Sequence, residues 1–199
     1  NIYLYDDKNR NLIFKTVKIC VDISFSFAVI ILFFWLFLII SFSIKVNSKG
    51  TIFFTQNRVG EQGRIFKIYK FRTMKSGTKD VGTHRINEKS ITSLGKILRK
   101  TKLDELPQII NILFGQMSLI GPRPGLPSQK SLYSERKKRG VFCVKPGISG
   151  YSQLNKIDMS DPKKLAEWDQ KYLAMRSVLF ELKLVFMSLT DGFGDRTRR

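Results

Sequence analysis

Two adjacent carboxylates, Asp104 and Glu105, stand among cations in the stretch LRKTKLDELPQIINILFGQMSLIGPRP. A carboxylate can attack phosphorus or hold a divalent metal ion. Arg99 precedes the pair, and Arg123 sits in the closing Gly-Pro-Arg-Pro turn, where its guanidinium can bind a phosphate through two hydrogen bonds. This pattern indicates a site for a diphosphate and a metal ion. An acidic pair can also simply complement a helix dipole, and the two carboxylates alone do not separate these readings.

The carboxylates lie where a helix is expected to begin. Pro107 has no amide hydrogen and is tolerated in a first helical turn. Apolar residues follow at helical spacing: Leu106, Ile109, Ile110 and Leu113. The helix should bury one face and stop near Gly115. Its positive end would favour ionised carboxylates and nearby phosphates, and adjacent side chains, about 100° apart, could take separate roles.

Two further stretches carry cations that could contact phosphate. The turn KPGISG, residues 145–150, begins with Lys145, and the expected strand IFKIYKFRTM, residues 65–74, places Lys70 and Arg72 between aromatic side chains. Alternating basic and aromatic residues can bind nucleic acid, phosphates or a membrane surface. The same pattern also describes an ordinary amphipathic strand with its aromatic residues in the core.

Composition restricts the class of chemistry. The chain has a formal net charge of +19, so its partners should be anionic: nucleic acid, acidic lipids or phosphorylated substrates. The only histidine, His84, lies in the polar stretch GTHRINEKS, which argues against a Ser-His-Asp triad. Cys20 and Cys143 are too few for a disulfide framework and have no metal-ligand spacing, so we expect reduced structural thiols.

An uncharged apolar segment, residues 23–44, has the length of a bilayer core. Its 22 residues would span about 33 Å as a helix. A buried core helix would be shorter and show a polar face, so we expect a membrane-embedded helix. Residues 45–199 carry 31 Lys and Arg against 13 Asp and Glu, which favours the cytoplasmic face for the domain. The segment has neither Pro nor Gly, which leaves open whether it is re-entrant or spans the membrane.

The remaining elements complete an α+β, mainly helical chain. Residues 51–74 predict a small antiparallel β-hairpin around a Gly-rich turn, residues 75–90 a mobile loop, and LGKILRK an amphipathic helix. Residues 166–175 and 178–189 predict helices that could lie on the membrane surface, and the second could equally be buried. The expected divisions are an N-terminal segment (1–22), a membrane-embedded helix (23–44), a catalytic domain (45–190) and a flexible tail (191–199).

Four motifs follow the apolar segment in this order: FFTQNRVG, FKIYKFRTM, LDELPQIINILFGQMSLIGPRP and KPGISGYSQLN. They resemble the bacterial sugar transferase family, the small monotopic phosphoglycosyl transferases, over nearly the whole chain. The Asp-Glu-Leu-Pro-Gln and Gly-Pro-Arg-Pro motifs are its most specific part. The resemblance favours catalysis by the acidic pair over simple dipole complementation.

The resemblance implies a defined reaction at the bacterial inner membrane. Such enzymes move a sugar-1-phosphate from a UDP-sugar to undecaprenyl phosphate, release UMP, and begin the synthesis of O-antigen, capsule or glycoprotein glycans. Asp104 would attack the sugar-linked phosphorus to give a phosphoglycosyl-aspartate, and Glu105 would hold Mg²⁺. The residues expected to bind phosphate or substrate are Arg99, Arg123, Lys70, Arg72, Lys145 and Asp169.

The sequence departs from the family pattern at two places. Phe34 and Trp35 occupy the positions of a helix-breaking Ser-Pro pair that gives the family its re-entrant hairpin. After Asn155 the chain reads KIDMS where the family often continues Gly-Arg. The stretch IDMSDPKKLAEWDQKY looks like members that take N-acetylated amino sugars, which makes such a sugar our expectation.

Two other classes explain parts of the sequence. A membrane-tethered nucleic-acid- or lipid-binding protein would account for the net charge, and a silent membrane scaffold would tolerate Asp104→Asn without loss of turnover. Neither accounts for the acidic pair beside the Pro-Arg-Pro turn. We therefore expect an Mg²⁺-dependent transferase whose partners are a UDP-sugar, polyprenyl phosphate and membrane phospholipid, with a homodimer as one assembly to consider and no nucleic acid.

Overall fold

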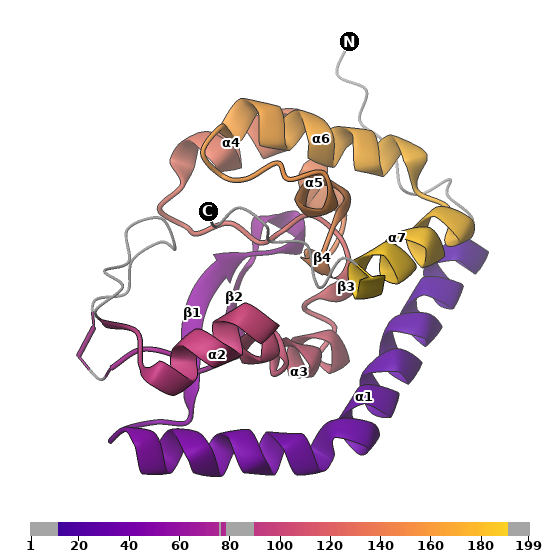
Figure 1. Cartoon of the computed structure of the whole chain (residues 1–199). Helices are drawn as coiled ribbons and strands as arrows, with labels where there is room; N and C mark the ends of the chain where they lie inside the picture. The colour runs from indigo at the N-terminus through magenta and orange to yellow at the C-terminus, as the bar shows by residue number, and fades with distance from the viewer. Residues whose placement is uncertain (1–11, 76, 79–89, 191–199) are drawn as a thin grey trace.

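The computed structural model describes residues 12–75, 77–78 and 90–190 of the chain. Helices and two small sheets make up this part, which confirms the predicted α+β, mainly helical class (Figure 1). The expected flexible tail, His84 and most of the expected loop lie outside the described residues. The elements in chain order are α1 (Leu12–Asn47), β1 (Phe53–Val59), η2 (Glu61–Gly63), β2 (Ile65–Phe71), α2 (Ser93–Thr101), η5 (Leu103–Glu105), α3 (Gln108–Leu113), β3 (Ser118–Ile120), α4 (Lys130–Lys138), η6 (Val141–Cys143), β4 (Gly147–Ser149), α5 (Tyr151–Leu154), α6 (Pro162–Met175) and α7 (Val178–Thr190).

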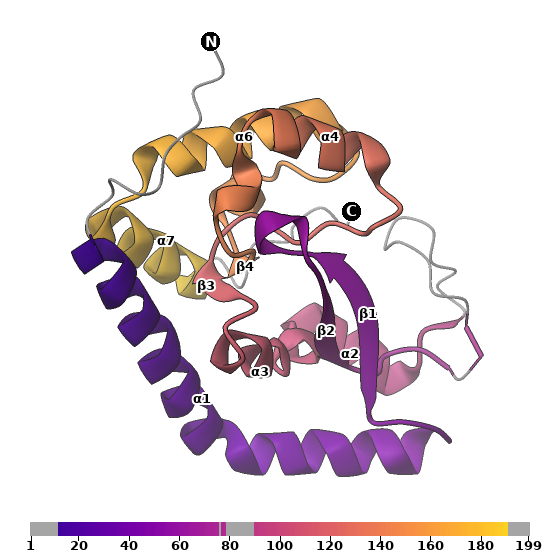
Figure 2. The same cartoon turned by 180° about the vertical axis from the view of Figure 1, so that it is seen from behind.

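Helix α1 is bent near its middle, and its two arms run along two sides of the globular part (Figures 1 and 2). The first arm is fastened by buried polar contacts. Lys18 Nζ lies 2.6 Å from Glu181 Oε2 of α7, and Asp22 Oδ1 accepts a hydrogen bond from the Leu119 amide at 3.1 Å. The helix continues through Asp22, so the predicted division at residue 22 does not coincide with a structural break.

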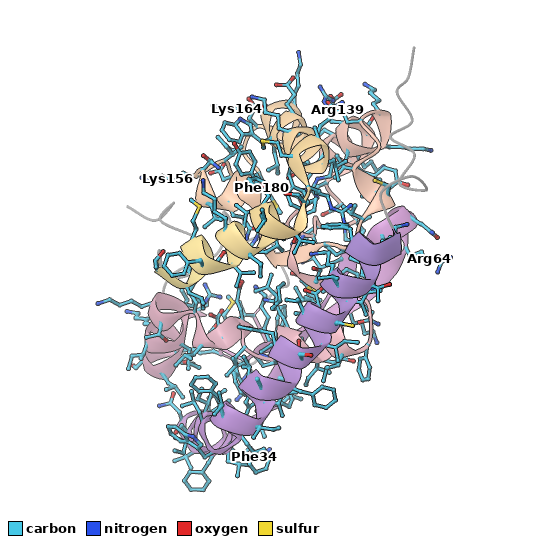
Figure 3. All side chains as sticks on the ribbon, turned by 90° about the vertical axis from the view of Figure 1, so that its right-hand side faces the viewer. Phe34, Arg64, Arg139, Lys156, Lys164 and Phe180 are labelled. Carbon is cyan, nitrogen blue, oxygen red and sulfur yellow. The ribbon has the colours of Figure 1, made fainter. Side chains whose placement is uncertain are left out.

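The second arm of α1 packs on a different part of the domain. Ile40 and Ile44 are buried against Phe71 of β2 and Leu98 of α2. Figure 3 shows Phe34 near the bend, where the large apolar side chains are exposed. Among the described helices, α1 alone has the length and apolar character needed to cross a membrane, and only 17% of its most apolar stretch is buried. This low burial contradicts the alternative of a core helix.

The predicted hairpin is confirmed. Strands β1 and β2 pair antiparallel from Phe53–Phe71 to Val59–Ile65. Gly63 in the connecting turn has φ 73°, a left-handed value that glycine adopts without steric cost. Strand β2 packs against η5 and α3, and α3 lies beside the hairpin in Figure 2.

A second, parallel sheet was not predicted. β3 and β4 pair Ser118 with Gly147 and Ile120 with Ser149. A Cβ on Gly121 would lie only 2.5 Å from the Lys145 carbonyl oxygen, so this close approach requires glycine. The GPRP and KPGISG segments, predicted as two separate turns, are therefore joined by backbone pairing.

Helices α6 and α7 confirm the two helices predicted near the C-terminal end. α6 packs on α4, and its Tyr172 and Leu173 join Leu184 of α7 in the main core. α7 also exposes a row of large apolar side chains: Leu179, Leu182, Phe186 and Leu189. The helix is thus buried on one face and apolar on its exposed face, so neither of the two predicted descriptions covers it alone.

Candidate active site

The acidic pair lies in a single 3₁₀ turn, η5, between α2 and α3. Lys102 ends α2 in a left-handed conformation, with φ 59°, and the chain reverses there. Asp104 and Glu105 follow directly, and Pro107 then caps α3. The predicted position at the start of a helix is confirmed, with the pair just outside α3 rather than within its first turn.

Glu105 is held by two cations from different elements. Its Oε1 lies 2.5 Å from Lys70 Nζ of β2 and 3.1 Å from Arg123 Nη2 in the turn after β3. Burial would raise the pKa of Glu105, but the charges of Lys70 and Arg123 outweigh this effect and hold the pKa well below its ordinary range. Glu105 is therefore an ionised carboxylate with a fixed orientation.

Asp104 has the opposite environment. Among the described residues its carboxylate accepts no hydrogen bond, although Lys70, Arg99 and Arg123 are near enough for their charges to act on it. Burial and the adjacent charge of Glu105 raise the pKa of Asp104 to about 6. The carboxylate oxygens of Asp104 are thus left available, and the ionised form dominates at neutral pH.

Arg99 approaches the pair from α2. Its Nε donates a hydrogen bond to Thr73 Oγ1 at 2.8 Å. α2 can lie this close to the end of β2 because a Cβ on Gly95 would stand 2.1 Å from the Thr73 carbonyl oxygen, so the position admits only glycine. Thr92 caps the helix by accepting from the Gly95 amide at 2.9 Å. The structure thus brings Arg99 near Asp104, and the sequence did not reveal Thr73 as its anchor.

Asp169 lies inside the fold rather than at the site. Its Oδ2 pairs with Arg136 Nη2 at 2.7 Å, and its Oδ1 accepts from Ser152 Oγ at 3.0 Å. Arg136 Nη1 in turn donates to the Arg123 carbonyl oxygen at 2.8 Å. Asp169 therefore supports the backbone of the turn that presents Arg123, instead of standing beside the carboxylates.

Two predicted phosphate-binding cations are not gathered with the acidic pair. Lys145 lies by Gly115, beyond the C-terminal end of α3, whereas the pair precedes its N-terminal end, about 9 Å away along a six-residue helix. Arg72 donates through Nη2 to the Ser48 carbonyl and hydroxyl oxygens, both at 2.7 Å. The structure therefore groups Lys70, Arg99 and Arg123 with the pair, and leaves Lys145 and Arg72 outside it.

The sequence analysis missed Asn111, which joins α3 to β2. Its Oδ1 accepts from the Tyr69 amide at 3.1 Å, and its Nδ2 donates to the Lys67 carbonyl oxygen at 2.7 Å. This fully buried side chain sets the position of Lys70 relative to Glu105. The signal that could have revealed it is a single Asn in the apolar run QIINILF, because a buried polar side chain must find partners.

The acidic pair also offers carboxylate ligands for a metal ion. No group of three His, Cys, Asp or Glu side chains converges within the described ranges 12–75, 77–78 and 90–190. Mg²⁺ commonly takes one or two protein carboxylates and completes its shell with water and substrate phosphates. Asp104 and the second oxygen of Glu105 fit such a donor set.

Residues 13–194 match the family described as bacterial sugar transferase. The chain is 37% identical over 192 residues to a UDP-glucose:undecaprenyl-phosphate glucose-1-phosphate transferase of Klebsiella pneumoniae, covering 92% of this chain and 41% of that protein. It is 36% identical to a UDP-N-acetylgalactosamine-undecaprenyl-phosphate N-acetylgalactosaminephosphotransferase of Aeromonas hydrophila, covering 92% and 46%. It is 32% identical to the exopolysaccharide production protein ExoY of Rhizobium meliloti, covering 84% and 81%.

Proposed function

The chain belongs to the bacterial sugar transferase family, and on this premise we propose that it transfers a sugar-1-phosphate from a UDP-sugar to polyprenyl phosphate and releases UMP. The chain spans about two fifths of the length of the first curated relatives that it matches. These relatives are named for the transfer of glucose-1-phosphate or N-acetylgalactosamine phosphate to undecaprenyl phosphate. We propose only the reaction that these relatives share, and we place it at the cytoplasmic face of the bacterial inner membrane.

The observation that carries this proposal is the contrast between two adjacent carboxylates. Glu105 is fixed by Lys70 and Arg123, whereas Asp104 keeps its oxygens free of hydrogen bonds within the described part of the chain. A nucleophile needs an available lone pair, and a metal-binding or orienting group needs a fixed position. The two environments suit these two roles.

The proposed reaction has two displacements at one phosphorus atom. An Asp104 oxygen attacks the phosphorus that carries the sugar, and the bond from this phosphorus to the UMP oxygen breaks. A phosphate oxygen of the acceptor lipid then attacks the same phosphorus, and the bond to Asp104 breaks. The Asp104 carboxylate is restored, and the lipid carries the sugar through a diphosphate. Arg99 and Arg123 are positioned to neutralise charge on the phosphoryl oxygens.

The proposal includes Mg²⁺, held by Glu105 with Asp104 beside it. When bound, Mg²⁺ would neutralise negative charge on the diphosphate of the donor. The protein's own contribution is to hold the Glu105 carboxylate ionised, through the contacts of Lys70 and Arg123. Removal of divalent ions by EDTA should abolish turnover, and Mg²⁺ should restore it.

The sugar is the least constrained part of the proposal. An N-acetylated amino sugar is favoured by the stretch IDMSDPKKLAEWDQKY, whereas the relatives include proteins named for glucose and for N-acetylgalactosamine. In the structure this stretch ends in α6, and Met159 lies 3.5 Å from Gln129 Nε2. The donor must be identified by assay.

The alternative is a membrane-tethered protein that binds nucleic acid or lipid without catalysis. The exposed lysines on α4 and α6, on the end of the molecule where Figure 3 labels Lys164 and Arg139, are the feature that favours it. It predicts salt-sensitive binding of nucleic acid that does not need Asp104. It gives no role to the convergence of three cations on two partly buried carboxylates.

A UMP-release assay tests the proposal. The purified full chain is incubated with Mg²⁺, undecaprenyl phosphate and a panel of UDP-sugars, including UDP-glucose, UDP-N-acetylglucosamine and UDP-N-acetylgalactosamine. One donor should give UMP, and Asp104→Asn should lower its rate at least about a thousandfold. Glu61→Gln, which alters a carboxylate in the hairpin turn at the opposite end of the strands from Lys70, is the matched control and should retain activity. Full activity in Asp104→Asn would show that Asp104 is not the nucleophile.

A further inference from the structure

A groove of about 620 Å³ lies along the start of β1, near the end of α1. Residues 51–55 line it, together with Lys45 and Arg72. Phe53 and Phe54 are each more than a third exposed there. The walls are therefore largely apolar, and both cations lie where α1 ends, since Lys45 bonds the Gly50 carbonyl oxygen and Arg72 bonds Ser48.

Arg72 is the unusual residue of this groove. It is only 9% exposed, and none of the described carboxylates pairs with it. Its Nη2 is bonded to Ser48, but its Nε has no hydrogen-bond partner. A buried cation without a counter-charge is costly, so the site lacks an anion that a ligand could supply.

The hairpin connects the lining of the groove to the residues that hold the acidic pair. Arg72 follows Lys70 by two residues, so the two side chains share one face of the strand, about 7 Å apart. Phe54 stands directly opposite Lys70 in the hairpin register, and Lys70 contacts Glu105. An anion at Arg72 would therefore lie next to the residues that hold the carboxylates.

The chemistry of the groove selects an amphiphile. It offers the Arg72 guanidinium, walls of aromatic and aliphatic side chains, and Lys45 in the last turn of the apolar helix α1. A nucleotide sugar is polar along its whole length and would leave Phe53 and Phe54 uncovered. An isoprenoid phosphate matches both the charge at one end and the apolar walls.

We propose that this groove binds the phosphate-bearing end of the polyprenyl phosphate acceptor, with the phosphate at Arg72 and the first isoprene units against Phe53 and Phe54. The inference rests on the proposed function and adds a separate site for the second substrate. The donor then uses Arg99 and Arg123, and the acceptor enters from the membrane past Lys45.

The test separates the two half-reactions. UMP released in one turnover without lipid measures the attack of Asp104 on the donor, and steady-state turnover against undecaprenyl phosphate in detergent micelles measures acceptor use. Phe54→Ala should raise the KM for undecaprenyl phosphate about tenfold, and Lys45→Gln about threefold, with the single-turnover release unchanged. Phe42→Ala removes an aromatic ring that is 72% exposed on α1, and should change neither quantity.

The outcomes are distinct. Absence of lipid-independent UMP release from the unmodified chain would contradict the covalent function itself. Normal release with an unchanged KM in both variants would overturn the groove assignment alone. An unchanged KM with weaker binding to phosphatidylglycerol vesicles would assign the groove to bulk anionic lipid and also overturn it. Because Lys45 is exposed, Lys45→Gln remains a valid test if Phe54→Ala loses thermal stability.

Discussion

Asp104 and Glu105 are neighbours in the chain, yet their carboxyl groups are pushed in opposite directions. Burial and the charge of Glu105 raise the pKa of Asp104, while Lys70 and Arg123 hold that of Glu105 low in spite of burial. Pairs of titratable groups separated in this way commonly divide the work of a reaction. The fold disfavours the ionised form of Asp104, so this carboxylate lowers the stability of the protein when it is ionised.

Replacement of Asp104 should therefore stabilise the protein while it removes activity. The folded-state pKa of Asp104 lies near 6 and the unfolded value near 3.8, so the ionised carboxylate lowers stability above pH 6. Asp104→Asn should raise the free energy of unfolding by about 1–2 kcal/mol at pH 7.5. The gain should shrink as the pH falls through 6 toward 4, as measured by thermal unfolding in EDTA.

Glu105→Gln provides the contrasting variant. Its pKa is depressed in the fold, so its ionisation contributes stability at pH values above its unfolded value, and this contribution is lost as the pH falls. The variant also leaves Lys70 and Arg123 without their carboxylate. It should lower the melting temperature at pH 7.5. If both carboxylates were merely solvated surface groups, the two variants would not shift the stability of the protein in opposite directions.

At the scale of elements, the turn that joins α2 to η5 stores backbone strain. Lys102 has φ 59° although it carries a side chain, a conformation that costs about 1 kcal/mol. Lys102→Gly should raise the free energy of unfolding by about 0.5–1 kcal/mol, because glycine adopts this conformation freely. Lys96→Gly, an equal change of charge within α2, should lower it by about 1 kcal/mol. Urea unfolding of both variants gives the comparison.

The contact between α3 and β2 depends on Asn111. Asn111→Ala should lower the free energy of unfolding by about 2–4 kcal/mol, because the Tyr69 amide and the Lys67 carbonyl oxygen lose their partner inside the fold. It should also raise the KM for the donor, because Lys70 loses its fixed place beside Glu105. Gln116→Ala removes only the third contact of Asn111, at 2.7 Å, and should cost less than half as much.

Local sequence patterns were enough to predict the hairpin, the helix start at Pro107 and helices α6 and α7. They did not reveal the β3–β4 pair, because strands of three residues have no period and their partners are separated by 29 positions in the registers Ser118–Gly147 and Ile120–Ser149. For the same reason, the sequence could not place Lys145 and Arg72 relative to the acidic pair. Lys145 and Arg72 have the right residue type, but only the tertiary fold shows which end of α3 and which side of Lys70 they occupy.

At the scale of the whole molecule, both ends of α1 lie against one domain. A straight helix of 36 residues would be about 54 Å long, and its far end could not return to the domain that its near end contacts. Here Lys18 reaches Glu181 from the first arm, and Ile44 packs on Phe71 from the second. The bend arises without Pro or Gly, so the docking of the two arms has to maintain it.

This shape predicts that α1 enters and leaves the membrane on the same side. Single cysteines at Thr16 and Lys49, which flank the apolar part, should both react with an impermeant maleimide in inside-out vesicles and neither in right-side-out vesicles. A cysteine at Trp35, 57% exposed near the bend, should react only after detergent is added. All three cysteine variants also carry Cys20→Ser and Cys143→Ala, so that neither native thiol reacts with the maleimide. Labelling of Thr16→Cys and Lys49→Cys from opposite sides would show a spanning anchor, which would require the first arm to leave Glu181 and expose Lys18 to lipid.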